Sequence, residues 1–252
     1  MRVLVLGGTS EATALAALLA AMPGVEAIMS FAGRTRAPSA PIPLRSGGFG
    51  GAEGLWQYLE AEGIDVLVDA THPFAAQISR NAEIAAARGN IPLVILSRPG
   101  WTREPQDRWT EVPDMAGAAA AIGRETRRVF LAIGRLQLAA FEAAPQHYYL
   151  IRTIEPIAPN LPHHRIIAAR GPFDTEAEER LLRDEKIDVI VAKNSGAAAV
   201  FAKILAARRL GLPVIMVERP AEASGVGVRA AHAAEALALI LGHGPRAALR
   251  GV

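Results

Sequence analysis

Short, unbroken runs of Val, Ile and Leu recur along the chain, and segments with helical spacing of apolar residues separate them. Such runs are typical of strands that are covered on both faces, as in parallel sheets. The alternation therefore predicts an α/β fold with doubly wound parallel sheets. The predicted strands are Val3–Leu6, Ala27–Ser30, Val66–Asp69, Leu93–Leu96, Val129–Ile133, Tyr148–Ile151, Val189–Val191 and Val214–Val217. The predicted helices are Glu11–Ala21, Ala52–Glu62, Gln77–Ala87, Thr175–Asp184, Ala197–Leu210 and Ala233–Leu241.

One pattern occurs twice, at Ile64–Pro99 and at Ile187–Pro220. Both segments read Ile-Asp, strand, polar turn, alanine-rich helix, glycine shortly before proline, strand and Arg-Pro. The distance between the two copies is far too long for a solenoid repeat. The copies are either two similar domains or β-α-β units that look alike without being related. Because the loop residues match too, we predict two tandem Rossmann-like domains with parallel sheets and a cleft between them. The predicted domains are residues 1–105 and 106–252, with the boundary in Pro99–Pro113.

The overall composition excludes several classes of function. The 252 residues carry a net charge of +2, which gives no global field for nucleic acid or membranes. The chain contains no cysteine, so disulfides and thiolate chemistry are excluded and a reducing cytosol fits. No segment resembles a secretion signal or a spanning helix, and we expect a soluble cytoplasmic protein. His163 and His164 lack a third ligand at a plausible spacing, so we expect no metal site.

A glycine turn, Gly7-Gly8-Thr9-Ser10-Glu11, follows the first predicted strand. Glycines let a backbone approach phosphate closely, and the amides that begin the next helix can donate to it. Thr9 and Ser10 add hydroxyl groups and can cap the helix. The spacing is not Gly-x-Gly-x-x-Gly, so an ordinary glycine turn is the alternative.

The end of the second strand indicates which nucleotide binds. An acidic residue there usually reads the ribose 2′-hydroxyl of NAD, but the segment from Ser30 to Arg36 contains no carboxylate. Ser30 and Arg34 suit a 2′-phosphate, which favours NADPH over NADH, although a solvated loop is the alternative. Gly48 and Phe49 lie in a glycine-dense segment, residues 45–51, which we interpret as a loop facing the cofactor rather than as a flexible surface loop.

Two further strand ends carry candidate chemistry. Thr71 and His72 follow the third strand, and His72 could donate a proton or bind a carboxylate, or it could merely hydrogen-bond its own loop. Asp69 is predicted to tie the neighbouring loop amides. In the second half, Lys193 and Ser195 lie at a predicted helix N-terminus and form a candidate anion site. Three arginines lie near other strand ends of that half, and incidental surface arginines are the alternative; they are Arg152, Arg170 and Arg219.

The motifs together resemble the precorrin-6A reductase family of cobalamin biosynthesis, which includes cobalt-precorrin-6A reductase, over nearly the whole chain. They are LGGTSEA, SFAGR, RSGGFGG, DATHPFA, SRP-x-W, RGPF, AKNSG and LGLPVIMVERP. The resemblance implies NADPH-dependent reduction of a C=C bond of the precorrin-6A macrocycle to give precorrin-6B. It places the cofactor on the first domain, at Gly8, Thr9, Ser10, Ser30, Arg34, Gly48, Phe49 and Thr71. It places the substrate at His72, Arg152, Arg170, Lys193, Ser195 and Arg219.

The resemblance has one departure, Asn194, where an acidic residue is common, so an acid–base role there is in doubt. His72 and Lys193 are the candidate catalytic proton donors, and water could serve instead. The expected partner is the tetrapyrrole, with neighbouring pathway enzymes as candidates. The alternatives are a cobalt-loaded substrate, a non-catalytic NADPH-binding module and a two-domain sugar-nucleotide transferase.

Overall fold

A computed structural model describes residues 1–31, 41–154, 157–220 and 226–244. The chain divides into two units. Unit 1 consists of Met1–Pro99 together with Ala221–Val252, and unit 2 consists of Gly100–Pro220. Within the described ranges, no helix is long and apolar enough to cross a bilayer.

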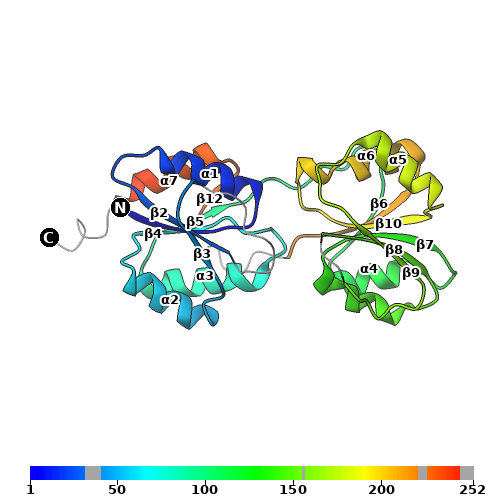
Figure 1. Cartoon of the computed structure of the whole chain (residues 1–252), viewed down its shortest axis with the longest axis horizontal. Helices are drawn as coiled ribbons and strands as arrows, with labels where there is room; N and C mark the ends of the chain where they lie inside the picture. Colours follow the sequence, from blue (N-terminus) through cyan, green and yellow to red (C-terminus); the bar gives the residue numbers. More distant parts are fainter. Residues whose placement is uncertain (32–40, 155–156, 221–225, 245–252) are drawn as a thin grey trace. The chain divides into compact units, whose positions relative to one another are not determined.

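Unit 1 is built on a parallel sheet with strand order β12-β5-β4-β1-β2-β3. The strands are β1 (Arg2–Leu6), β2 (Glu26–Phe31), β3 (Leu44–Ser46), β4 (Val66–Asp69), β5 (Leu93–Leu96) and β12 (Val228–Ala230). Helices α1 (Ser10–Ala20) and α7 (Ala233–His243) cover one face, and α2 (Gly51–Ala61) and α3 (Ala76–Gly89) cover the other (Figure 1).

The first strand shows why an unbroken apolar run is needed. Because side chains alternate between the faces of a strand, Val3 and Val5 pack with the core under α1 and α7. Leu4 and Leu6 pack with the core under α2 and α3. A polar residue at any of these positions would lie inside one of the two cores, so β1 reads as continuous apolar sequence.

Unit 2 repeats the arrangement with strand order β6-β11-β10-β7-β8-β9, again all parallel. The strands are β6 (Arg108–Val112), β7 (Arg128–Ala132), β8 (Tyr148–Thr153), β9 (His164–Ala168), β10 (Val189–Lys193) and β11 (Pro213–Val217). The helices are α4 (Met115–Ala121), the 3₁₀ helix η1 (Arg135–Ala143), α5 (Thr175–Asp184), the 3₁₀ turn η2 (Ala198–Val200) and α6 (Ala202–Leu210). Helices α5 and α6 pack together on one face of the sheet, and α4 lies on the other (Figure 1).

Each sheet has one edge strand that comes from the part of the chain directly after the other sheet's β5 or β11. Strand β6 follows β5 in the sequence but pairs with β11, and β12 follows β11 but pairs with β5. The two units are therefore joined by two chain connections. The predicted domain 106–252 differs from the structure at its C-terminal end, because β12 and α7 belong to unit 1.

The eight predicted strands are all present, and the described residues contain four further strands that were not predicted. The missed strands β3, β6, β9 and β12 lie at the edges of the sheets, and their short sequences LRS, RWTEV, HRIIA and VRA carry charged or polar side chains. They lack the apolar run that marks a central strand. The predicted helix Ala197–Leu210 is interrupted, because η2 ends at Val200 and α6 begins at Ala202.

Candidate functional site

The carboxyl ends of the strands of unit 1 bring most of the predicted cofactor residues to one edge of the sheet, as expected for parallel strands. The turn after β1 begins with Gly7, whose N–H donates to the Ser30 carbonyl over 2.9 Å. A Cβ on Gly7 would lie 2.7 Å from Met29 Sδ, so a side chain there would displace Met29. Gly8 adopts a φ of 130°, which L-residues rarely adopt. The glycines therefore meet specific backbone requirements.

Thr9 caps the helix that follows the turn. Its Oγ1 accepts a hydrogen bond from Ala12 N over 3.1 Å and donates to the Ala70 carbonyl over 2.8 Å. The Thr9 hydroxyl is thus engaged within the protein, while Gly8 and Ser10 are exposed. The cap leaves the first amides of α1 at the exposed edge, which is the geometry of an anion site at a helix N-terminus.

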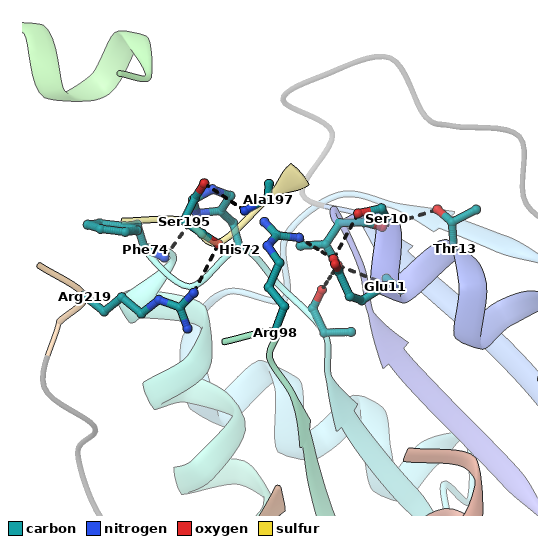
Figure 2. Close-up of polar contacts among 12 residues, drawn as sticks. Ser10, Glu11, Thr13, His72, Phe74, Arg98, Ser195, Ala197 and Arg219 are labelled. Atoms are coloured by element: carbon teal, nitrogen blue, oxygen red, sulfur yellow. Dashed lines mark hydrogen bonds and ion pairs between the residues drawn. The ribbon is translucent and has the colours of Figure 1, made fainter. Parts of the chain in front are cut away.

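A polar network continues from this turn to the end of β5 (Figure 2). Ser10 Oγ donates to Glu11 Oε2 over 3.1 Å, and Glu11 forms an ion pair with Arg98. Arg98 lies just after β5, so the ion pair joins two residues that are 87 positions apart in the sequence. We did not predict this pair, and only the acidic residue in the phosphate turn indicated that a balancing cation was needed.

Ser30 lies buried at the end of β2, and its partner in the neighbouring strand β3 is Arg45. Arg45 Nη1 lies 3.3 Å from Ser30 Oγ and donates to the Gly47 carbonyl over 2.7 Å, while Nη2 donates to the Gly48 carbonyl over 3.1 Å. The guanidinium also stacks 3.9 Å from the centre of the Phe49 ring. Sequence reasoning missed Arg45 as a site residue because β3 is too short to be recognised as a strand.

Arg34, the predicted reader of a 2′-phosphate, lies outside the described residues. The cation that the structure places against Ser30 is Arg45, held by two backbone carbonyls and by the rings of Phe49 and Tyr58. A guanidinium held in this way loses little freedom when it binds an anion.

The loop after β4 holds Thr71 and His72. Asp69 Oδ1 accepts hydrogen bonds from Thr71 N over 3.0 Å and from Thr71 Oγ1 over 2.7 Å, which confirms the predicted structural role of Asp69. His72 Nδ1 accepts from Phe74 N over 3.2 Å, so the neutral ring carries its proton on Nε2 (Figure 2).

In unit 2, the loop after β10 is held by Arg219, a predicted site residue, and by Asn194, which was not predicted as one. Arg219 donates from Nε to the Asn194 carbonyl over 2.9 Å and from Nη2 to the Ser195 carbonyl over 3.1 Å. Asn194 clamps the Trp101 backbone, because Oδ1 accepts from its N–H over 2.6 Å and Nδ2 donates to its carbonyl over 3.1 Å. The Ser195 hydroxyl is buried and accepts from Ala197 N over 3.4 Å (Figure 2). Asn194 therefore fixes the loop mechanically.

Arg152 forms an internal ion pair that sequence reasoning missed. Its Nη1 and Nη2 donate to the two carboxylate oxygens of Glu178 over 2.8 and 2.6 Å, and the two side chains are 9% and 4% exposed. Phe173 stacks 4.1 Å from the guanidinium. The expected substrate contact of Arg152 is thus replaced by a structural pair, whereas Arg170 is exposed.

Burial affects two lysines of unit 2. Burial lowers the pKa of Lys193, whose Nζ would lie 3.9 Å from a Cβ on Gly134. Burial also lowers the pKa of Lys203 to about 7, although the Glu178 carboxylate opposes the shift. Lys203 Nζ donates to the Val200 carbonyl over 2.6 Å. A lysine in the alanine-rich helix α6 was the signal in the sequence that could have revealed this buried group.

Within the described residues, no group of three or more His, Asp or Glu side chains is arranged to hold a metal ion. The model of the precorrin-6x reductase family CbiJ/CobK matches residues 2–240. The chain belongs to this family of reductases.

Several members of the precorrin-6x reductase family are similar over most of their length. The precorrin-6A reductase of Rhodobacter capsulatus is 53% identical over 87% of this chain and 88% of the relative. The precorrin-6A reductase of a Sinorhizobium species is 53% identical over 90% and 88%. A solved structure described as CobK precorrin-6A reductase has a TM-score of 0.90 and 48% identity, covering 100% of both chains.

Proposed function

We propose that this chain is a precorrin-6A reductase that uses NADPH to reduce one C=C bond of the precorrin-6A macrocycle, giving precorrin-6B in cobalamin biosynthesis. The names of the relatives that are 53% identical support the substrate. The observation in the molecule that carries the proposal is the edge of unit 1, where a glycine turn opens α1 and a guanidinium lies against Ser30. An edge of this kind suits a nucleotide with an extra phosphate.

The cofactor would bind along this edge. The turn at Gly8 and Ser10 would receive the pyrophosphate, because the first amides of α1 lie at that point. Ser30 and Arg45 would bind the 2′-phosphate, with Arg34 as a second cation from the neighbouring segment. The sequence places no carboxylate from Ser30 to Arg36, so nothing there would repel that phosphate. The bound cofactor supplies the hydride.

The carboxylates of the substrate would bind to unit 2. Lys193 and the exposed Arg170 are the cations that we assign to them, since Arg152 is paired with Glu178. Arg219 would act by holding the carbonyl groups of the loop that carries Lys193. This assignment divides four predicted cations into two that bind substrate and two that position their neighbours.

Reduction of the C=C bond adds a hydride to one carbon and a proton to its neighbour. His72 would donate from Nε2 as the imidazolium, which requires the Nδ1 contact with Phe74 N to break. The lowered pKa of Lys193 makes its ammonium a better proton donor than an exposed lysine. Single-turnover rates of H72N, K193M and the double variant test these two groups. An unchanged rate in the double variant would leave water as the proton source.

The central experiment mixes the purified protein with NADPH and metal-free precorrin-6A under anaerobic conditions and follows loss of the reduced nicotinamide. We expect oxidation of NADPH only when the tetrapyrrole is present, and much slower reaction with NADH. Failure to oxidise NADPH in the presence of the macrocycle would contradict the proposal and favour a binding module without catalysis.

A cobalt-loaded substrate is the second candidate. Proteins named cobalt-precorrin-6A reductase are also similar to this chain, for example that of Priestia megaterium at 29% identity over 86% of this chain. The higher identity to the precorrin-6A reductases favours the metal-free ring. Parallel assays with metal-free and cobalt-loaded macrocycles decide between them.

A further inference from the structure

A carboxylate lies in the turn where we propose that the cofactor's pyrophosphate binds. Glu11 is the second residue of α1, directly after the exposed Ser10. A carboxylate in the first turn suits the helix dipole in the free protein. It would nevertheless repel a phosphate bound to the same amides, and repulsion between charges is strong where water is partly excluded. The site therefore needs a means of neutralising Glu11.

Arg98 meets this requirement. Its guanidinium forms an ion pair with Glu11, and the two side chains are only 12% and 22% exposed. Arg98 is the second residue after β5, while Glu11 belongs to α1, so the fold of unit 1 brings the two charges together at the carboxyl edge (Figure 2). An ion pair with this degree of burial is less screened by water and salt than a surface pair.

We propose that Arg98 is a positioning residue for the cofactor, which acts by neutralising Glu11 so that the turn at Gly8 and Ser10 can accept the pyrophosphate. This inference rests on the proposed use of NADPH. In the free protein the Ser10 hydroxyl donates to Glu11. Rotation about one side-chain bond releases that hydroxyl for the phosphate, while Arg98 keeps Glu11 paired.

Two other roles for Arg98 make different predictions. If Arg98 contacted the phosphate directly, its removal would weaken binding equally whether or not Glu11 were charged. If Arg98 only stabilised the fold, its removal would lower the melting temperature and leave nucleotide affinity unchanged. Neutralisation alone predicts that the effect of removing Arg98 depends on the charge of Glu11.

The test measures Kd for NADPH and NADH by nicotinamide fluorescence in wild type, R98M, E11Q and the double variant R98M/E11Q. Loss of one partner of a desolvated pair leaves the other charge uncompensated, so R98M should raise Kd by about tenfold. E11Q should lower Kd by about threefold, and the double variant should bind clearly more tightly than R98M. The fold-change in R98M should be the same for both nucleotides, because the pyrophosphate is common to them.

R88M is the matched control, since Arg88 forms an ion pair with Glu53 between α3 and α2, away from this turn. R98K, which keeps the charge, serves if R98M does not fold, and it should bind within about threefold of wild type. Equal losses in R98M and the double variant would overturn the inference, as would an unchanged Kd in R98M. A wild-type protein that binds neither nucleotide would instead contradict the proposed function.

Discussion

The sheets of the two units have the same strand order, but the helix that follows β1 in unit 1 differs from the helix that follows β7 in unit 2. In unit 1, β1 leads through a glycine turn into α1, an α-helix of 11 residues capped by the Thr9 side chain. In unit 2, the equivalent strand β7 leads through Gly134 into η1, a 3₁₀ helix without a side-chain cap. Aligned amides at a capped α-helix suit an anion, and a 3₁₀ helix has poorer hydrogen-bond geometry.

The difference teaches that one sheet topology can present two chemically different edges. Unit 1 presents glycines, hydroxyl groups and a backbone amide array, which suit phosphate. Unit 2 presents the cations Lys193 and Arg170, while Arg152 pairs with Glu178 of α5 and Arg219 holds the loop after β10. The proposed division of cofactor and substrate between the units follows from these side chains and not from the fold.

The largest expected effect comes from cutting the chain where the sequence suggested a domain boundary. A chain of residues 1–105 lacks β12 and α7, so the core positions filled by Ala236 and Ile240 are empty and the outer edge of β5 is open. We expect no cooperative urea unfolding for this fragment. Residues 1–99 joined by a Gly/Ser linker to 226–252 should unfold cooperatively and bind NADPH. Cooperative unfolding of the 1–105 fragment would contradict the assignment of β12 to unit 1.

The second prediction tests whether the Arg152–Glu178 ion pair stabilises unit 2 without affecting cofactor binding in unit 1. R152M leaves the buried Glu178 carboxylate unpaired and should reduce the free energy of unfolding by about 3 kcal/mol. The matched control R183M removes an exposed partner of Glu179 and should cost less than about 1 kcal/mol. Urea titration measures both free energies. A changed Kd for NADPH in R152M would contradict the proposal that the cofactor binds to unit 1 independently of Arg152.

The third prediction concerns the buried amine of Lys203. Its pKa is about 7 in the folded chain against 10.5 ordinarily, so above pH 7 the folded state loses a proton that the unfolded state keeps. The free energy of unfolding of the wild type should therefore rise relative to K203M by about 2 kcal/mol between pH 7 and pH 9. Urea unfolding at several pH values measures this gain, with K186N as the exposed control. A pH-independent difference would show that the lysine stays charged.

The smallest expected effect is on nucleotide preference in unit 1. R45Q should raise Kd for NADPH by about tenfold and leave Kd for NADH within about threefold. R88Q is the matched control, because Arg88 stacks 3.9 Å from the Trp56 ring just as Arg45 stacks on Phe49. Equal losses for both nucleotides in R45Q would mean that Arg45 only holds the loop.

The central strands could be predicted because burial on both faces forces unbroken apolar sequence, as in β1 and β4. The edge strands could not, because an edge position tolerates charge, and Arg45 was missed together with β3. The glycine turn and the loop of Asp69 could also be predicted, because the residues that form each of them are close together in the sequence. The pairs Arg152–Glu178 and Glu11–Arg98 join distant elements, and α5 reads as a solvated acidic helix until packing buries Glu178.

Strand β12 lies near the C-terminal end of the chain but belongs to the sheet of unit 1, and this fixes the order in which the two sheets can be completed. Unit 2 ends at Pro220, so its sheet needs none of the residues that follow. Unit 1 begins first but must wait for β12 at Val228–Ala230, and until then the outer edge of β5 stays unpaired. An open edge strand can pair with another chain, so unit 1 is exposed to intermolecular strand pairing until β12 is in place.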